Sequence, residues 1–529
     1  MDVLKSFFLG EDNKANIFIN AIIAFAATLI ASVLNLHHGH EIMIDDFCQY
    51  IMQAGALLNG SIDDFIKANS YIISHSWMGM GMTVYPWGFP LMIAVVMKLG
   101  GGFMQWKMIG VLCLCLCAVF VYLLALKRSN RWIALLAALF VAFDYELVVT
   151  AANRILSDIP YCMLTLLGLY SMELMGRAET RKREYVYAAI LGFSASYASE
   201  TRSNGYLIMA TFICAVGLAM LADRFKKFEW LKQVQWRVHA GPFLTAWGVY
   251  LAVVLSFRLL FPGNFGSFYM FQKFSVYNIV TISDINFWSI RNNLFLSVDE
   301  NATYVIYAAF VLLFLCGCAY KFYQNFIMLF YCAGTFCLYM IWQYLDDNSA
   351  RLLYSLALCM IPVAVSGLNW LREQKDINYK LAVVAASVVL FIAMLRVFGD
   401  GYKNVCVNQR ECAVGAFTND SLGLYDYIKQ HTKESDVILF EKPRLLYWCT
   451  GRLCFLPQSF YGNLVEIPKA DYLLTIQGFP CSMSFLNNFA YAEKFLEVNC
   501  HCRLQQCYAN ATYTMWKVIV ESESPQVPK

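Results

Sequence analysis

Long apolar stretches recur along the first three quarters of the chain, and each is close to the length that crosses a bilayer. A helix that rises 1.5 Å per residue needs roughly 20 apolar residues to span a hydrocarbon core about 30 Å thick. The first stretch lacks a small-residue cleavage site and leads into a long apolar region, so we interpret it as a span and not as a cleaved signal peptide. The pattern predicts eleven membrane-spanning helices, over residues 17–36, 105–127, 132–150, 158–176, 186–201, 204–222, 241–261, 301–320, 326–344, 351–370 and 380–398.

Basic residues gather in alternate connections between these stretches. Cytoplasmic loops are enriched in lysine and arginine, so this alternation indicates how the chain is oriented in the membrane. If the N-terminus is cytoplasmic, all the basic connections fall on the cytoplasmic side, and an odd number of spans then predicts an extracytoplasmic C-terminal region. The basic connections are residues 127–131, 177–183, 224–227, Lys321 and 372–380.

Composition agrees with a polytopic α-helical membrane protein. The chain is 59% hydrophobic and 15% charged, and its mean hydropathy is +0.51, far outside the range of soluble domains. The sequence has no phosphate-binding glycine loop, dinucleotide fingerprint or paired CxxC zinc motif. We therefore expect membrane lipids as partners, no nucleic acid, and no cytosolic nucleotide as an activated donor.

Residues 399–529 differ in composition from the membrane region at 1–398. Strand-like runs at 437–440, 472–475 and 515–520, with a helix at 421–431, predict a small α/β domain. An even number of cysteines in an extracytoplasmic domain favours disulfide bonds over buried free thiols, although their pairing cannot be deduced from sequence. These cysteines are Cys406, Cys412, Cys449, Cys454, Cys481, Cys500, Cys502 and Cys507.

The connection at 37–104 is long and patterned. Apolar and amide residues recur at helical spacing from about 46 to 59, which predicts a helix lying along the membrane surface and ending at Asn59-Gly60. The run 85–90 predicts a rigid turn, and 91–99 a second half-buried element.

Carboxylates gather on the predicted outer side. A carboxylate beside a bilayer is costly unless it is paired or used, so each is a candidate for function, with hydration among the lipid headgroups as the alternative. Asp158 is the strongest of them by position, because it begins a span where Ser157 and Arg154 could hold it. The outer carboxylates form three clusters, which are Asp45 and Asp46 with Glu41, then Asp158, and then Asp346 with Asp347.

Two arginines, Arg202 and Arg351, lie at outer ends of predicted spans. The guanidinium group matches phosphate oxygens bidentately, so both are candidates for holding a lipid phosphate. Snorkelling of these side chains to the membrane interface is the structural alternative.

A histidine-rich segment follows the first span. His37, His40 and Glu41 could bind a divalent metal ion, but the spacing is loose and no second ligand cluster matches it. An interfacial polar linker is the favoured interpretation, and no cofactor is firmly predicted.

Several short motifs on the outer side occur in a recognisable order. As a set they resemble the GT-C glycosyltransferases, in particular the bacterial relatives of protein O-mannosyltransferases and the lipid A aminoarabinose transferase. The resemblance covers most of the chain. The motifs are Asp46-x3-Tyr50-x3-Ala54-x2-Leu57-Leu58-x-Gly60, Tyr85-Pro86-Trp87-Gly88-Phe89-Pro90-Leu91, Arg154-x2-Ser157-Asp158-x-Pro160, Thr201-Arg202-x2-Gly205 and Ala350-Arg351-x2-Tyr354, with Tyr427-Ile428, Lys442-Pro443-Arg444 and Thr450-Gly451-Arg452 in the C-terminal domain.

The resemblance implies an enzyme that takes a sugar from a polyprenyl-phosphate carrier. The family's catalytic aspartate corresponds to Asp46, with Asp45 beside it, and a second carboxylate to Asp158. The usual Tyr-Pro-Pro-Gly is Tyr-Pro-Trp-Gly here, and the lysine that the aminoarabinose enzymes carry near this turn is missing, which weakens the case for an aminoarabinose donor. Trp87 could stack on a sugar or anchor at the interface. The residues expected to contact substrate are Tyr50, Tyr85, Trp87 and Tyr354.

The expected reaction is inverting sugar transfer to a lipid, glycan or protein acceptor, with one carboxylate as general base and a stabilised leaving phosphate. The C-terminal domain would cover the site or hold the acceptor. A transporter or lipid-carrier flippase is the main alternative, yet such proteins usually show internal repeats and charges near mid-membrane. A structural or assembly protein is a third possibility. Because the motifs resemble the bacterial branch of the family, we expect a bacterial inner membrane and not the endoplasmic reticulum.

Overall fold

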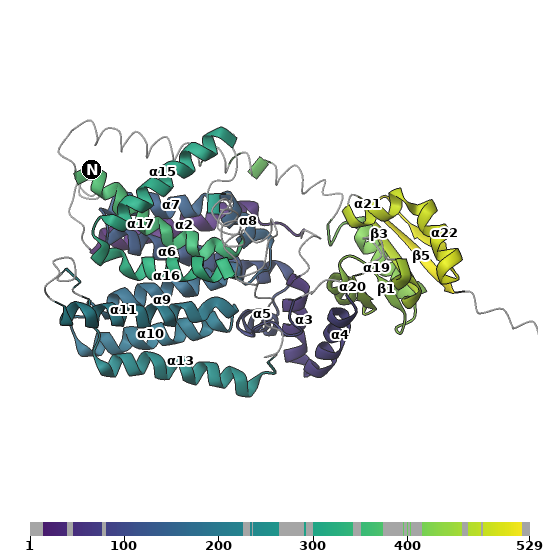
Figure 1. The fold of residues 1–529 in the computed structure, drawn as a ribbon, viewed down its shortest axis with the longest axis horizontal. Coiled ribbons are helices and arrows are strands. Elements are labelled where there is room, and N and C mark those ends of the chain that lie inside the picture. The colour runs from purple at the N-terminus through teal and green to yellow at the C-terminus, as the bar shows by residue number, and fades with distance from the viewer. Residues whose placement is uncertain are drawn as a thin grey trace, which may run out of the picture.

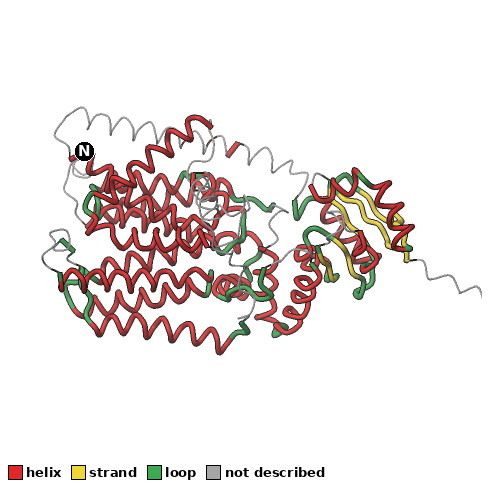
Figure 2. Tube along the Cα trace, viewed as in Figure 1, coloured by secondary structure: helices red, strands yellow, loops and turns green. Residues whose placement is uncertain are grey.

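The structure is a computed structural model. It describes residues 14–39, 46–76, 81–225, 233–234, 236–263, 290–291, 300–341, 351–373, 395, 399, 402–403, 415–456, 464–477 and 480–520. Long helices form a bundle, and a small domain with a sheet lies at one end of it (Figure 1; Figure 2). A layer of shorter helices lies between the two.

The helices of the bundle follow the predicted apolar stretches. By length and apolar composition, five described helices can cross a membrane, or six if a bent pair counts as one span. The predicted total of eleven therefore stays a prediction, and the eleventh stretch, 380–398, lies outside the described residues. The bundle helices are α2 (Lys14–Asn35), α6 (Phe103–Leu126), α7 (Arg131–Ala142), α8 (Tyr145–Asn153), α9 (Asp158–Met175), α10 (Arg181–Ser199), α11 (Leu207–Arg224), α13 (Ala240–Leu260), α15 (Glu300–Ala319), α16 (Phe322–Ile341) and α17 (Tyr354–Glu373).

The predicted span at 132–150 is broken. Helices α7 and α8 meet at an angle of 53°. Asp144 lies at the break and caps α8, since its Oδ1 accepts a 2.9 Å hydrogen bond from the amide of Leu147. A side-chain cap replaces the missing intrahelical partners at a helix start, so the chain can turn here. The bend directs α8 toward the beginning of α9.

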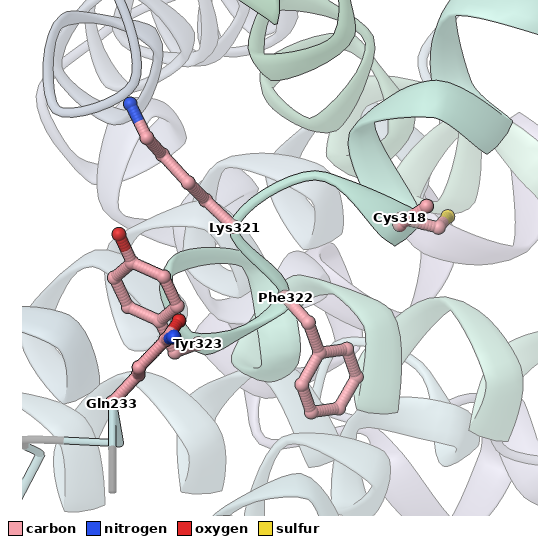
Figure 3. Close-up of a pocket in the computed structure, with 6 residues that line it drawn as sticks. Gln233, Cys318, Lys321, Phe322 and Tyr323 are labelled. Carbon is pink, nitrogen blue, oxygen red and sulfur yellow. The ribbon is translucent and has the colours of Figure 1, made fainter. Parts of the chain in front are cut away.

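Buried polar contacts link the helices at the end of the bundle that lies away from the C-terminal domain. Arg128 donates to Glu173 Oε1 at 2.5 Å and to Asn325 Oδ1 at 2.8 Å. Glu173 is 15 residues beyond the start of α9, which corresponds to about 22 Å of helix. A shallow pocket lies nearby, at the turn between α15 and α16 (Figure 3), so it is remote from the beginning of α9. Its lining includes Gln233, Cys318, Ala319, Lys321, Phe322 and Tyr323.

The connection after α2 forms three short helices, α3 (Asp46–Asn59), α4 (Ile62–His75) and α5 (Gly88–Lys98). The predicted helix at 46–59 is confirmed as α3, while its position along the membrane surface stays a prediction; Gly60, at φ +68°, ends it in a conformation that favours glycine. The predicted element at 91–99 corresponds to α5, which begins three residues earlier. Helix α4 was not predicted. These helices lie between the bundle and the C-terminal domain (Figure 1).

The C-terminal domain is α/β, as predicted. Its sheet has the order β2-β1-β3-β5-β4, in which β1 pairs in parallel with β2 and β3, while β5 is antiparallel to β3 and β4. The predicted helix and three predicted strand runs correspond to α19, β1, β3 and β5, whereas β2 and β4 were missed. The elements are α19 (Asn419–His431), β1 (Val437–Leu439), α20 (Pro443–Thr450), β2 (Leu453–Phe455), η4 (Leu464–Lys469), β3 (Tyr472–Ile476), α21 (Pro480–Asn487), α22 (Phe489–Cys500), β4 (Cys502–Ala509) and β5 (Tyr513–Val520).

The predicted disulfides are not formed by the described cysteines of this domain. The thiols of Cys454 and Cys502 are buried in the apolar core. A buried thiol packs as a small apolar group, which is the role that these side chains have here. Cys406, Cys412 and the side chain of Cys481 lie outside the described part of the structure. The described cysteines that form no disulfide with one another are Cys449, Cys454, Cys500, Cys502 and Cys507.

An apolar core joins the C-terminal domain to α3, α5 and the start of α6. Its centre is an edge-to-face cluster of four rings, in which Phe47 lies 5.7 Å from Trp448 and 6.3 Å from Phe103. Phe417 contacts all three, at 5.0–6.4 Å. Such pairs stabilise by about 0.5–1.5 kcal/mol each beyond the burial of their area. The domain is therefore packed on the membrane region and not merely tethered to it.

Candidate active site

The carboxylate of Asp46 lies where distant parts of the chain meet. Asp46 is the first residue of α3, and its Oδ1 accepts a 2.7 Å hydrogen bond from the Tyr85 hydroxyl. Arg351, just before α17, donates from Nη2 to Oδ2 at 2.8 Å. Arg444 of α20 places its Nη1 3.5 Å from Oδ1. Two guanidinium groups and a phenol thus surround one carboxylate.

A second carboxylate, Asp158, lies beside the first. It begins α9, is 3% exposed and forms an ion pair with Arg202. Arg351 Nη1 is 3.9 Å from Asp158 Oδ2. Arg351 therefore lies between the two carboxylates, and the aspartates and arginines predicted from separate motifs form one network.

The hydrogen bonds around Asp46 favour its ionised form. Burial by itself would raise the pKa of Asp46, but attraction by Arg351 and Arg444, with the hydrogen bonds from Arg351 and Tyr85, lowers it from 3.8 to about 2. Burial raises the pKa of Tyr85 well above its usual value, so its hydroxyl stays protonated and can donate. At neutral pH this carboxylate is an anion.

The four predicted substrate-contacting residues have different surroundings. Tyr85 contacts Asp46, and the hydroxyl of Tyr50 lies 2.9 Å from Ser157 Oγ, next to Asp158. Tyr354 lies one turn beyond Arg351 and shares hydrogen bonds with Thr150 and Glu146, at 2.9 and 3.0 Å. Tyr50 and Tyr85 therefore belong to the network itself.

Trp87 has a structural environment. It is 4% exposed, stacks on Phe261 at 5.0 Å, and donates its indole N–H to the carbonyl of Pro262 at 2.8 Å. A ring covered in this way is not available to stack on a sugar. The side chain instead fastens the turn before α5 to the end of α13.

Gly88 explains how this turn is positioned. Its amide donates to the carbonyl of Glu200 at 2.5 Å, and its carbonyl accepts from Tyr197 at 2.9 Å. A Cβ at this position would lie 2.6 Å from the Glu200 carbonyl and from Thr201 Oγ1, so any larger residue would separate α5 from the end of α10. Because Arg202 follows directly, the same contact sets the distance between Tyr85 and the Asp158–Arg202 pair.

The candidate metal ligands His37, His40 and Glu41 are only partly within the described residues, so a metal site there stays an open alternative to the polar linker. Asp45, His40 and Glu41 lie outside the described residues, as do Asp346 and Asp347. His37 accepts a hydrogen bond from the amide of Gly39 at 3.0 Å, while its carbonyl accepts one from Lys107 at 2.7 Å. Burial, with the charge of Lys107, lowers the pKa of His37 to about 4. Within the described part of the chain no three His, Cys, Asp or Glu residues could hold a metal ion.

Sequence reasoning misassigned Arg154 and did not identify Glu146 or Arg444 as site residues. Arg154 donates to Glu146 at 2.8 Å and to Thr150 at 3.1 Å, whereas the described ion-pair partners of Asp158 are Arg202 and Arg351. The motif Lys442-Pro443-Arg444 was noted in the sequence, but its distance from Asp46 along the chain gave no reason to place the two together.

Solved structures define the fold class. ArnT from Cupriavidus metallidurans, bound to undecaprenyl phosphate, aligns with a TM-score of 0.56 at 10% identity, over 94% of this chain and 97% of that one. The Archaeoglobus fulgidus oligosaccharyltransferase with Zn and sulfate gives a TM-score of 0.58 at 10% identity, over 94% of this chain and 73% of that one. AglB from the same organism, with an inhibitory peptide and a dolichol-phosphate, gives 0.52 at 11% identity, over 97% and 75%. The fold is that of the GT-C glycosyltransferases.

One family model also matches by sequence. Residues 107–260 match the model of dolichyl-phosphate-mannose-protein mannosyltransferase. This segment, less than half of the chain, runs from α6 to α13 and contains Asp158 and Arg202. A comparison with curated protein sequences gave no match. The resemblance to GT-C glycosyltransferases that the motifs indicated is confirmed.

Proposed function

We propose that this protein is a membrane glycosyltransferase that moves a sugar from a polyprenyl-phosphate carrier to an acceptor on the extracytoplasmic face. The observation that carries the proposal is the position of Arg351 between Asp46 and Asp158, beside Arg202. The transfer of a sugar from a lipid phosphate requires a carboxylate and cationic groups that lie side by side. Catalysis needs a base for the acceptor hydroxyl and positive charge for the departing phosphate.

In this proposal Arg202 and Arg351 bind the carrier phosphate. Their side chains are 19% and 20% exposed, so both can be reached by a ligand, and guanidinium forks suit phosphate oxygens. The comparison structures are consistent with such a donor, since ArnT binds undecaprenyl phosphate and AglB a dolichol-phosphate.

Asp46 is the proposed general base. It is ionised at neutral pH, as a general base must be. Because two arginines attract it, its pKa is lowered to about 2, and the carboxylate is therefore only weakly basic in the free protein. Phosphate oxygens that take over the N–H groups of Arg351 would weaken this attraction. Donor binding would thereby raise the basicity of Asp46 at the moment when it is needed.

Asp158 has a separate proposed role. Its Oδ2 is buried and accepts no hydrogen bond from the described residues. Arg351 Nη1 lies 3.9 Å from this oxygen, and movement of Arg351 toward the carrier phosphate would open Oδ2 to a hydrogen bond from a sugar hydroxyl. The outcome of such an arrangement, with one base and no covalent intermediate, would be inversion at the anomeric carbon.

The alternative of a transporter or flippase predicts charges deep in the bilayer. The charges of this site instead lie where α9, α17 and the C-terminal domain meet. We propose that this domain, residues 399–529, is extracytoplasmic and that the membrane is a bacterial inner membrane, with residues 1–398 forming the transmembrane domain.

The test is a donor-consumption assay. Purified protein in liposomes is incubated with labelled polyprenyl-phosphate sugars, and loss of label from the lipid is followed for the wild type, Asp46→Asn and Asp158→Asn. Consumption of a donor by the wild type, with loss in both variants, supports the proposal. Movement of intact labelled lipid between leaflets without cleavage would establish the flippase instead.

A further inference from the structure

The C-terminal domain contributes a side chain to the proposed site. Arg444 is the second residue of α20, and its side chain is 1% exposed. Its Nη1 donates to the Tyr85 hydroxyl at 3.1 Å, and Tyr85 donates in turn to Asp46 at 2.7 Å. The guanidinium also lies over the Tyr85 ring, 5.4 Å from its centroid. Arg444 therefore acts on Asp46 through Tyr85 as well as by its charge.

Burial separates Arg444 from the other two arginines. Arg202 and Arg351 are about one fifth exposed, so a phosphate can reach them, whereas Arg444 is enclosed behind Tyr85. Gly81, whose φ of +87° favours glycine, lies beside this pair, and a Cβ at this position would be in ordinary contact with the Tyr85 hydroxyl at 3.4 Å and with Arg444 at 3.9 Å. A buried guanidinium is costly unless it is paired, which indicates that its contacts with Tyr85 and Asp46 matter.

We infer that Arg444 is a positioning residue, through which docking of the C-terminal domain orders Tyr85 and Asp46 in the site. This inference rests on the proposed function. Leu445 and Leu446, the next residues of α20, are fully buried in the core shared with α3. Trp448, one turn further, packs on Phe47, the neighbour of Asp46. The helix that anchors the domain is thus the helix that presents Arg444, so a displaced domain would take the arginine with it.

The direct test compares two buried arginines of the same domain. Arg444→Met should lower turnover by roughly 10- to 100-fold, the equivalent of a lost hydrogen bond to a charged group, while the domain stays folded. Arg444→Lys keeps the charge but not the planar fork, so it should recover part of the loss. A turnover of Arg444→Met within twofold of the wild type would overturn the inference.

Arg452→Met is the matched control. Arg452 is also buried, at 8% exposed, but its guanidinium donates to Thr432, Lys429 and Thr450 within the C-terminal domain. This variant should lower the thermal stability of the domain and leave the turnover of the folded protein near that of the wild type. Equal losses of turnover in both methionine variants would mean that only the integrity of the domain matters, and would contradict a specific role of Arg444.

Docking is tested with Trp448→Ala. If docking acts on the site through Arg444, the loss of turnover in the Trp448→Ala, Arg444→Met double variant should be close to that of Arg444→Met alone. If the fold-loss of turnover in the double variant equals the product of the two single fold-losses, Trp448 and Arg444 act independently, and the coupling is refuted.

A measurement without substrate separates this inference from the proposed function. The melting temperatures of Asp46→Asn, Arg444→Met and the double variant are compared in detergent. If the two residues are coupled, the decrease in melting temperature of the double variant should be clearly smaller than the sum of the decreases in the two single variants. A decrease equal to that sum would overturn the inference. If the wild type consumed no polyprenyl-phosphate sugar, the proposed function would fail while this result would still stand.

Discussion

Replacing Asp46 by asparagine tests the centre of the proposed site. The change keeps the size of the side chain and removes its charge and proton-accepting oxygen. As a lost general base it should lower turnover by about 10²–10⁴-fold. The lowering of its pKa from 3.8 to about 2 corresponds to roughly 2 kcal/mol of net stabilisation, which remains after the attraction of the arginines and the hydrogen bond from Tyr85 have offset the cost of burial. The variant should lose stability of that order at neutral pH.

The pH dependence has a definite sign. Because the pKa of Asp46 is lower in the folded protein than in the unfolded chain, its stabilising contribution is complete above about pH 4 and is lost as the pH falls toward 2. Asp46→Asn should therefore differ from the wild type in thermal stability at pH 7 and approach it in acid. Thermal unfolding in detergent at both pH values measures the difference.

Donor binding should respond differently from turnover. Arg351 donates to Asp46 in the free protein, so asparagine leaves its N–H groups less occupied. The donor affinity of Asp46→Asn should be unchanged or somewhat higher while turnover collapses. Titration with the identified carrier lipid measures this. Asp63→Asn, an exposed carboxylate on the neighbouring α4, is the control and should change neither property.

Two outcomes would refute the reasoning. Near-normal turnover of Asp46→Asn with an inactive Asp158→Asn would move the base to Asp158. A large loss of donor affinity in Asp46→Asn would show that the carboxylate takes part in donor binding and does not compete for Arg351.

Three further predictions address the surroundings of the site. Arg351→Ala should weaken carrier binding by about 1.5–3 kcal/mol, with partial recovery in the lysine variant; unchanged binding in a direct titration would favour snorkelling. Trp87→Phe should lose about 0.5–1.5 kcal/mol of stability with its hydrogen bond, yet keep donor affinity, and a selective loss of affinity would restore a sugar-stacking role. Gly88→Ala should cost about 1–3 kcal/mol by overpacking against Glu200, and a melting temperature equal to that of the wild type would contradict the close contact.

Topology is tested by an impermeant maleimide. The free thiol of Cys500 is partly exposed in the C-terminal domain. An extracytoplasmic domain predicts its modification in intact cells or spheroplasts, mapped by mass spectrometry. Modification only after the membrane is broken would place the domain in the cytoplasm.

The sequence by itself determined the apolar helices, the short helix at 46–59 and the candidate charges Asp46, Asp158, Arg202 and Arg351. Helix periodicity and the cost of charge beside a bilayer are local properties, so they can be read from neighbouring residues. The sequence also indicated the α/β domain, although strands β2 and β4 were missed. A strand of three residues such as β2 carries little periodic signal, and the eight-residue β4 has a register shift between Gln506 and Tyr508 that interrupts the alternation of its side chains.

Only the tertiary structure decided which charges meet. Arg351 and Asp46 are 305 residues apart, and Arg444 and Asp46 are 398 apart. Trp87 similarly acquired a structural role through Pro262, 175 residues away. Such pairs depend on how the bundle, the short helices and the C-terminal domain pack together, and no local pattern encodes that. The same packing decided that Arg351 lies between two carboxylates, which is the feature on which the proposed chemistry depends.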